Sequence, residues 1–192
     1  MAVRISTLLC FMAAAIIQLP EAHSRTTQPT RYDAARELRE QFDPRYYLIQ
    51  RSQRTDRKLG NDATCVSVLE LIPVYGEFSI LANFSIQQSS AIDPTTNITV
   101  IMTAYTPDQS PIRNMIETLD AATYGLVYNQ KLVFSDYRSC RVLTYEDQGD
   151  INCELWMINS AARGSIPQNC SLAYDRYCKT KHYIFDTDCL PK

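Results

Sequence analysis

The chain has 192 residues, of which 45% are hydrophobic and 21% are charged, and its formal net charge at pH 7 is −2. This length predicts one domain with one core, and the hydrophobic content is typical of a folded chain. The small net charge offers no basic surface that could neutralise a row of phosphates, so nucleic acid is excluded as an expected partner.

The first 24 residues predict a secretory signal peptide. Met1–Arg4 is positively charged, and Leu8–Leu19 is an apolar run of 12 residues, which is too short to span a bilayer. Small residues at Ala22 and Ser24 then suit the −3 and −1 positions of a cleavage site. We expect a secreted, extracellular protein without a membrane span, with residues 1–24 as signal peptide and 25–192 as a single domain.

Cysteines and sequons agree with secretion. The mature chain keeps six of the 7 cysteines, because Cys10 leaves with the signal peptide. An even number in an oxidising compartment predicts a disulfide framework, whose pairing stays open at this point. Sequons at Asn83, Asn97 and Asn169 predict a glycoprotein.

The first predicted element is a short helix at Asp33–Phe42. Asp33 is a suitable N-cap, and Ala34, Leu38 and Phe42 recur at helical spacing.

From Arg45 onward the chain changes to short alternating, β-branched or aromatic runs that are separated by turn signals. Strands at such short spacing predict an all-β sandwich or barrel. Pro167–Cys178 predicts a second helix, and His182–Phe185 a last short strand. The other predicted strands are Arg45–Gln50, Thr64–Ile72, Glu77–Gln87, Ile98–Tyr105, Arg113–Leu119, Tyr124–Asn129, Lys131–Tyr137, Cys140–Tyr145 and Asn152–Asn159.

Catalytic signatures are missing from the sequence. The mature chain has one histidine, His182, and no GxSxG nucleophile turn, glycine-rich phosphate loop, CxxC or HExxH spacing. We therefore expect a protein that is not an enzyme and that carries no catalytic residue, metal or cofactor.

The strand with the sequence NCELWMIN carries the candidate binding residues. Alternation places Glu154 and Trp156 on one face, and Cys153, Leu155 and Met157 on the other. The second face suits packing beneath a helix, so Glu154 and Trp156 point inward. Two interpretations stay open: the carboxylate binds a cationic or hydroxylated ligand, or it pairs with an internal Arg or Tyr while Trp156 fills the barrel floor.

This strand resembles the [Y/C]-E-L-W strand of tick salivary lipocalins of the histamine-binding-protein family. Gly60–Val66 (GNDATCV) and Ser165–Cys170 (SIPQNC) resemble two further family motifs. The resemblance covers most of the mature chain and implies an eight-stranded antiparallel lipocalin barrel with an N-terminal and a C-terminal helix packed outside. The japanin-like group is similar in its CxLW strand and six mature cysteines, although Glu154 differs from that group's usual residue.

The resemblance also implies a set of bonds and contacts. The implied disulfides are Cys65–Cys189, Cys140–Cys170 and Cys153–Cys178, and the implied ligand-binding residues are Asp56, Glu154 and Trp156.

Departures from the amine-binding pattern weigh against a cationic ligand. Arg141 stands where amine binders have an aspartate, and Gln53 and Leu59 stand where the family has binding aromatics. The leading hypothesis is therefore a salivary lipocalin that sequesters a small, mostly apolar host ligand (sterol, fatty acid or eicosanoid) and modulates host immune and inflammatory defence.

Two alternatives stay open. One is a scavenger of a biogenic amine, histamine or serotonin. The other is an inhibitor of a host immune or clotting protein on a lipocalin scaffold, acting through the loops at Asp93–Asn97 and Tyr105–Pro111.

Overall fold

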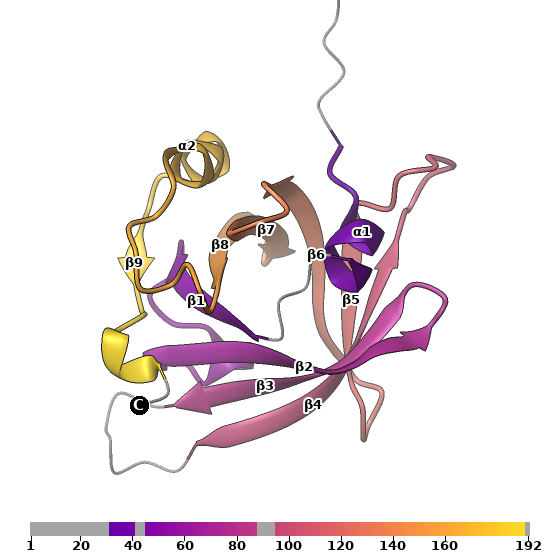
Figure 1. The fold of residues 1–192 in the computed structure, drawn as a ribbon, viewed down its shortest axis with the longest axis horizontal. Helices are drawn as coiled ribbons and strands as arrows, with labels where there is room; N and C mark the ends of the chain where they lie inside the picture. Colours follow the sequence, from indigo (N-terminus) through magenta and orange to yellow (C-terminus); the bar gives the residue numbers. More distant parts are fainter. Residues whose placement is uncertain (1–30, 41–44, 88–94, 191–192) are drawn as a thin grey trace, which may run out of the picture. The chain divides into compact units, whose positions relative to one another are not determined.

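The computed structural model describes residues 31–40, 45–87 and 95–190, so the predicted signal peptide lies outside the described residues. Antiparallel strands β1 to β8 follow one another around a closed barrel, in which β1 pairs with both β8 and β2 (Figure 1). The eight-stranded lipocalin barrel expected from the resemblance is confirmed. The barrel strands are β1 Arg45–Arg51, β2 Cys65–Gly76, β3 Ser79–Gln87, β4 Thr96–Tyr105, β5 Met115–Asp120, β6 Leu126–Ser135, β7 Cys140–Asp147 and β8 Asp150–Ile158.

Two helices and a short ninth strand complete the described chain. Helix α1 (Ala34–Arg39) precedes the barrel, α2 (Gln168–Tyr177) follows it, and β9 (His182–Tyr183) pairs with β1. Two 3-10 turns lie at Arg57–Leu59 and Thr187–Cys189. Among the described residues, no helix combines the length and the apolar character needed to cross a membrane.

The sequence-based prediction was wrong at β6, where two predicted strands, Tyr124–Asn129 and Lys131–Tyr137, form one. Alternation continues through the predicted break, because Tyr128, Gln130 and Leu132 are all buried. Gln130, which the prediction left between the two strands, points inward, and its side-chain amide donates a hydrogen bond to a carboxylate inside the barrel.

Local signals account for several element ends. The Asp33 carboxylate accepts hydrogen bonds from the backbone N–H groups of Ala35 and Arg36, which confirms it as the N-cap of α1. Gly149 has φ of 89° in the β7–β8 hairpin, a left-handed conformation that favours glycine.

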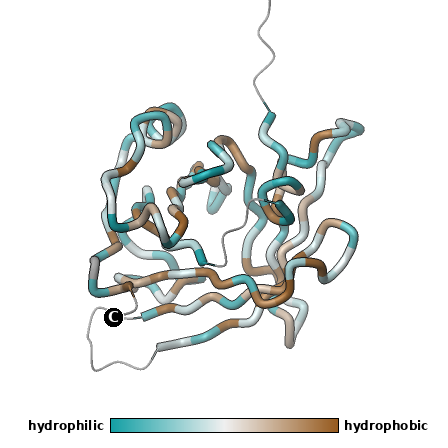
Figure 2. The backbone as a smooth tube through the Cα atoms, in the orientation of Figure 1, coloured by the Kyte–Doolittle hydropathy of each residue, from teal (hydrophilic) through white to brown (hydrophobic). Residues whose placement is uncertain are grey.

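The strands separate two apolar clusters, and hydrophobic and hydrophilic stretches alternate along them (Figure 2). The interior cluster includes Trp156, and the outer cluster beneath α2 includes Cys153, Leu155 and Met157. The two faces predicted for β8 are confirmed.

Disulfides join the barrel to the C-terminal part of the chain. Cys140–Cys170 and Cys153–Cys178 attach β7 and β8 to α2, and Cys65–Cys189 attaches the start of β2 to the C-terminal segment. This is the pairing that the resemblance implied. Each bond closes a loop and contributes about 2–4 kcal/mol in the chain-entropy description.

Candidate functional site

Asp56 caps the 3-10 turn that follows β1, and its side chain is 3% exposed. One carboxylate oxygen accepts from the backbone N–H of Lys58 at 2.8 Å. The other accepts from the hydroxyls of Tyr128 at 2.6 Å and Tyr145 at 2.8 Å. The fold thus brings two aromatic side chains from β6 and β7 onto this carboxylate.

Glu154 lies on the inward face of β8 and is 1% exposed. Its Oε2 atom accepts from the side-chain amide of Gln130 at 2.7 Å and from the indole N–H of Trp156 at 2.9 Å. Its Oε1 atom is buried and has no hydrogen-bond partner among the residues that the structure describes. A buried acceptor without a partner is costly, so this oxygen is available to a ligand or a proton.

Arg51 is the cross-strand partner of Glu154 in the β1–β8 ladder and is also buried. Its guanidinium donates to the backbone carbonyls of Gln53, Arg54 and Asn61. These bonds hold the guanidinium against the β1–β2 connection, where its positive charge lowers the pKa of Glu154 against the larger effect of burial.

At neutral pH, the protonated and the ionised forms of Glu154 are present in comparable amounts. Burial, with a further contribution from the Asp56 carboxylate, raises the pKa of Glu154 from 4.5 to about 7. Burial and the same carboxylates raise the pKa of Tyr128 and Tyr145, so both hydroxyls stay protonated and donate.

Gln53 and Leu59, which stand where the resemblance implies binding aromatics, take other roles. Leu59 is fully buried in the interior cluster, and the side-chain amide of Gln53 donates to the Tyr145 hydroxyl at 3.0 Å. Sequence reasoning missed Tyr128 and Tyr145 as site residues. Strand alternation could have identified them as inward-facing residues. Tyr145 lies on the same inward face of β7 as Arg141, and Tyr128 lies on the same inward face of β6 as Gln130.

A second polar cluster contains Glu37 of α1, which is fully buried. Its two carboxylate oxygens accept from the hydroxyls of Tyr46 at 2.8 Å and Ser135 at 2.7 Å. A guanidinium nitrogen of Arg141 lies 3.9 Å from Glu37 Oε1. Sequence reasoning missed Glu37, although it follows Ala34 by three residues and so lies on the same helix face.

The two clusters lie toward opposite ends of the barrel. Helix α1, which carries Glu37, and the residue before it are hydrogen-bonded to three connections at one end of the barrel. These are Glu77 in the β2–β3 connection, Arg113 in the β4–β5 connection and Tyr137 in the β6–β7 connection. Asp56 instead lies in the β1–β2 connection, at the end where the β5–β6 and β7–β8 turns also lie.

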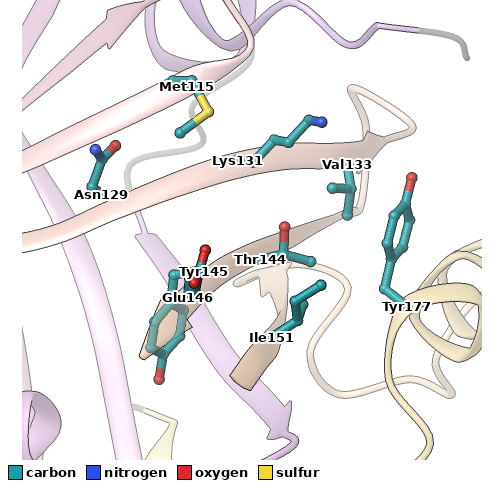
Figure 3. A pocket seen from close by; sticks show the side chains of 9 residues that line it. All are labelled: Met115, Asn129, Lys131, Val133, Thr144, Tyr145, Glu146, Ile151 and Tyr177. Carbon is teal, nitrogen blue, oxygen red and sulfur yellow. The ribbon is translucent and has the colours of Figure 1, made fainter. Parts of the chain in front are cut away.

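A groove of about 430 Å³ lies on the outer wall of the barrel, against α2 (Figure 3). Ile151 and Tyr177 in this groove are 63% and 43% exposed. None of the predicted ligand-binding residues lines it. Its lining residues are Met115, Asn129, Lys131, Val133, Thr144, Tyr145, Glu146, Ile151 and Tyr177.

The candidate glycan acceptors lie at the surface. Asn83 on β3 donates its side-chain N–H to the side-chain carbonyl of Asn97 on β4 at 3.1 Å. Asn169 is exposed in the first turn of α2, and its side-chain carbonyl accepts from the backbone N–H of Cys170. Glycosylation at the three sites stays a prediction.

The candidate loops for a protein partner are only partly described. Asp93 and Pro94 lie outside the described residues. In the loop at Tyr105–Pro111, the Asp108 carboxylate forms an ion pair with Arg31 at 2.8 Å. The protein-inhibitor hypothesis stays a prediction.

Comparisons with known proteins agree with this architecture. The family described as "Tick histamine binding protein" matches residues 23–191. A male-specific histamine-binding salivary protein of Rhipicephalus appendiculatus is 27% identical over 198 residues, which cover 96% of each chain. Both the family and this relative are described by the binding of a small ligand and not by a catalytic activity.

Two solved structures share the fold. AM182 in a serotonin complex has a TM-score of 0.61 and 21% identity, over 85% of this chain and 96% of its own. Japanin from Rhipicephalus appendiculatus, bound to cholesterol, has a TM-score of 0.56 and 15% identity, over 76% of this chain and 95% of its own. With the family match across nearly the whole length, the chain belongs to the tick histamine-binding protein family.

Proposed function

We propose that the protein is a secreted tick lipocalin that sequesters a small cationic amine inside its barrel, with Glu154 as the counter-charge. The observation that carries this proposal is the buried Oε1 atom of Glu154, which lacks a partner among the described residues. An ammonium or imidazolium group would donate to this oxygen, and it would share the rings of Tyr128 and Tyr145 with the exposed Lys58 side chain or displace that side chain from them.

The charge balance of the interior supports a cation. Among the described residues, the buried acidic and basic side chains are three carboxylates and two guanidiniums. With all of them ionised, one negative charge remains in excess, and a buried charge without compensation is costly. A cationic ligand would neutralise it, as would a proton on Glu154. The carboxylates are Glu37, Asp56 and Glu154, and the guanidiniums are Arg51 and Arg141.

The relatives support the same ligand class. The curated relative is a histamine-binding salivary protein, and AM182 was solved as a serotonin complex. Two aromatic side chains, Tyr128 and Tyr145, lie beside Asp56, although the sequence pattern had suggested that the binding aromatics were lost. The exposed Lys58 ammonium lies over both rings, 4.8 Å and 5.6 Å from their centres, so a cation is already seated against them.

An apolar ligand is the second candidate function. The observation in its favour is the apolar stretch of inner wall on β2 to β4, to which Val68, Ile80, Phe84, Val100 and Met102 contribute. Japanin, which shares the fold, was solved bound to cholesterol. Sequestering either kind of ligand would modulate host defence.

The proposal is tested by calorimetry with histamine and serotonin on the wild type and on Glu154→Gln. We expect the substitution to raise the Kd at least about tenfold, or about 1.4 kcal/mol, because it removes the counter-charge and preserves the shape. Glu146→Gln is the matched control, since Glu146 is exposed on the outer face of β7.

The same protein, secreted from eukaryotic cells, is denatured, extracted and analysed by mass spectrometry. A stoichiometric sterol or fatty acid would favour the second candidate. An unchanged amine Kd in Glu154→Gln would contradict the first.

A further inference from the structure

Arg141 is a buried arginine inside an otherwise aromatic and acidic cluster. Its side chain is 1% exposed, and its guanidinium carbon lies 4.2 Å from the ring centre of Tyr46 and 5.8 Å from that of Trp156. The Glu37 carboxylate lies beside it at 3.9 Å.

These surroundings have the composition of a site for an organic cation. They provide one buried carboxylate and two aromatic faces, which are the groups that stabilise a desolvated ammonium or guanidinium. The hydroxyls of Tyr46 and Ser135 fix the position of the carboxylate through one hydrogen bond to each oxygen. The carboxylate and the aromatic rings of such a site replace the water molecules that a cation loses when it is buried.

We propose that Arg141 is a tethered occupant of a cation site formed by Glu37, Tyr46 and Trp156. The guanidinium reaches this site from β7, so it is present at a very high effective concentration that a free amine cannot match. This end of the barrel is thereby closed to cationic ligands. Arg141 thus acts as a specificity-determining residue that leaves the Asp56–Glu154 end as the place for a ligand cation.

The closing of the site depends on α1 as well as on Arg141. Ala34 and Leu38 pack into the interior cluster beside Glu37, and each is fully buried. The tethered cation therefore also holds the helix that carries its carboxylate. The consequence for the number of bound ligands rests on the proposed function, whereas the occupancy of the site by Arg141 does not.

The proposal is tested by chemical rescue of Arg141→Ala with methylguanidinium. The probe is used at millimolar concentrations, far below those at which guanidinium denatures proteins. We expect a saturable rise in the Tm of Arg141→Ala, by about 3–6 °C at about ten times the Kd of the probe, because the vacated site takes up the free cation.

Two variants serve as controls. Arg113 stacks on Phe78 at 3.6 Å but is not buried, so Arg113→Ala loses a stacked arginine without vacating a buried acidic site. The double variant Glu37→Gln/Arg141→Met removes both charges and fills the vacated space with an apolar side chain, so the carboxylate that binds a cation is absent. Neither control should respond to methylguanidinium.

Four outcomes would overturn the proposal. In the first, methylguanidinium does not change the Tm of Arg141→Ala. In the second and third, it raises the Tm of the double variant or of Arg113→Ala as much as that of Arg141→Ala. In the fourth, Arg141→Ala fails to fold even with methylguanidinium, while the double variant folds.

Calorimetry with histamine and serotonin then counts the ligands. We expect one amine per wild-type barrel and two per Arg141→Ala barrel, so two amines on the wild type would also overturn the proposal. An absence of amine binding by the wild type would refute the proposed function alone, since methylguanidinium rescue does not depend on it.

Discussion

At Glu154, burial and hydrogen bonding act on the pKa in opposite directions. Burial and Asp56 raise the pKa, whereas the bonds from Trp156 and Gln130 and the charge of Arg51 lower it, and the result is about 7. At neutral pH the carboxyl group is therefore partly protonated in the empty protein. A bound cation would favour the ionised form, so we expect amine binding to release protons.

This shift gives stability a defined pH dependence. Between pH 4.5 and about 7 the folded chain keeps a proton on Glu154 that the unfolded chain has released. The contribution of this group to stability is therefore complete below pH 4.5 and is lost as the pH rises through about 7. Urea unfolding of the ligand-free protein across this range should show a smaller loss of stability with pH in Glu154→Gln than in the wild type.

Glu146→Gln is again the control and should follow the wild type. An identical pH dependence in Glu154→Gln and the wild type would show that the buried carboxyl group does not titrate in this range.

At the scale of the element, α1 is stabilised by its contacts with the rest of the fold. A helix of six residues is unstable alone. We expect Glu37→Ala to lower the free energy of unfolding by about 3–5 kcal/mol, because it leaves the buried Arg141 without its carboxylate. Urea unfolding measures this loss. Glu40→Ala, at the exposed end of the same helix, should change stability by about 0.5 kcal/mol or less, and equal effects of the two substitutions would contradict the assignment.

Strands β3 and β4 bring two glycosylation sequons into one register. Asn83 lies opposite Thr99, and Ser85 lies opposite Asn97, so the acceptor asparagine of each sequon faces the hydroxyl residue of the other. The two acceptor side chains are hydrogen-bonded at 3.1 Å, so a glycan on one would crowd the other.

We therefore expect secreted molecules to carry one glycan on this pair rather than two, and Asn97→Gln to raise occupancy at Asn83. Glycopeptide mass spectrometry measures the occupancy of each site, with Asn169 as an internal reference. Two glycans on the pair in most molecules would contradict the prediction.

At the scale of the described barrel, the two faces of one closed sheet have different surroundings. Its inner face holds the polar clusters, and its outer face packs against α2 through two disulfides. Because strand alternation assigns each residue to one face, the same β8 segment places Glu154 inside the barrel and Cys153 in the disulfide to α2.

Much of this could be predicted from local sequence. Alternation along β8 was sufficient to place Glu154 and Trp156 inside, because the faces of a strand depend only on its own residues. The short strands with turn signals between them indicated an all-β fold, and the motifs around Glu154 and Cys65 indicated the family. The sequence alone also indicated a disulfide framework, since six cysteines follow the predicted signal peptide.

Only the tertiary structure decided which of these residues meet. Tyr128 and Tyr145 bond to Asp56 across 72 and 89 residues of chain, and Glu37 meets Ser135 across 98. Contacts between residues so far apart in the sequence depend on the closure and the register of the barrel, which local patterns do not encode. For the same reason, the sequence predicted only that the positive charge of Arg141 would repel an amine. The closed barrel places its guanidinium beside Glu37, a carboxylate of the same chain.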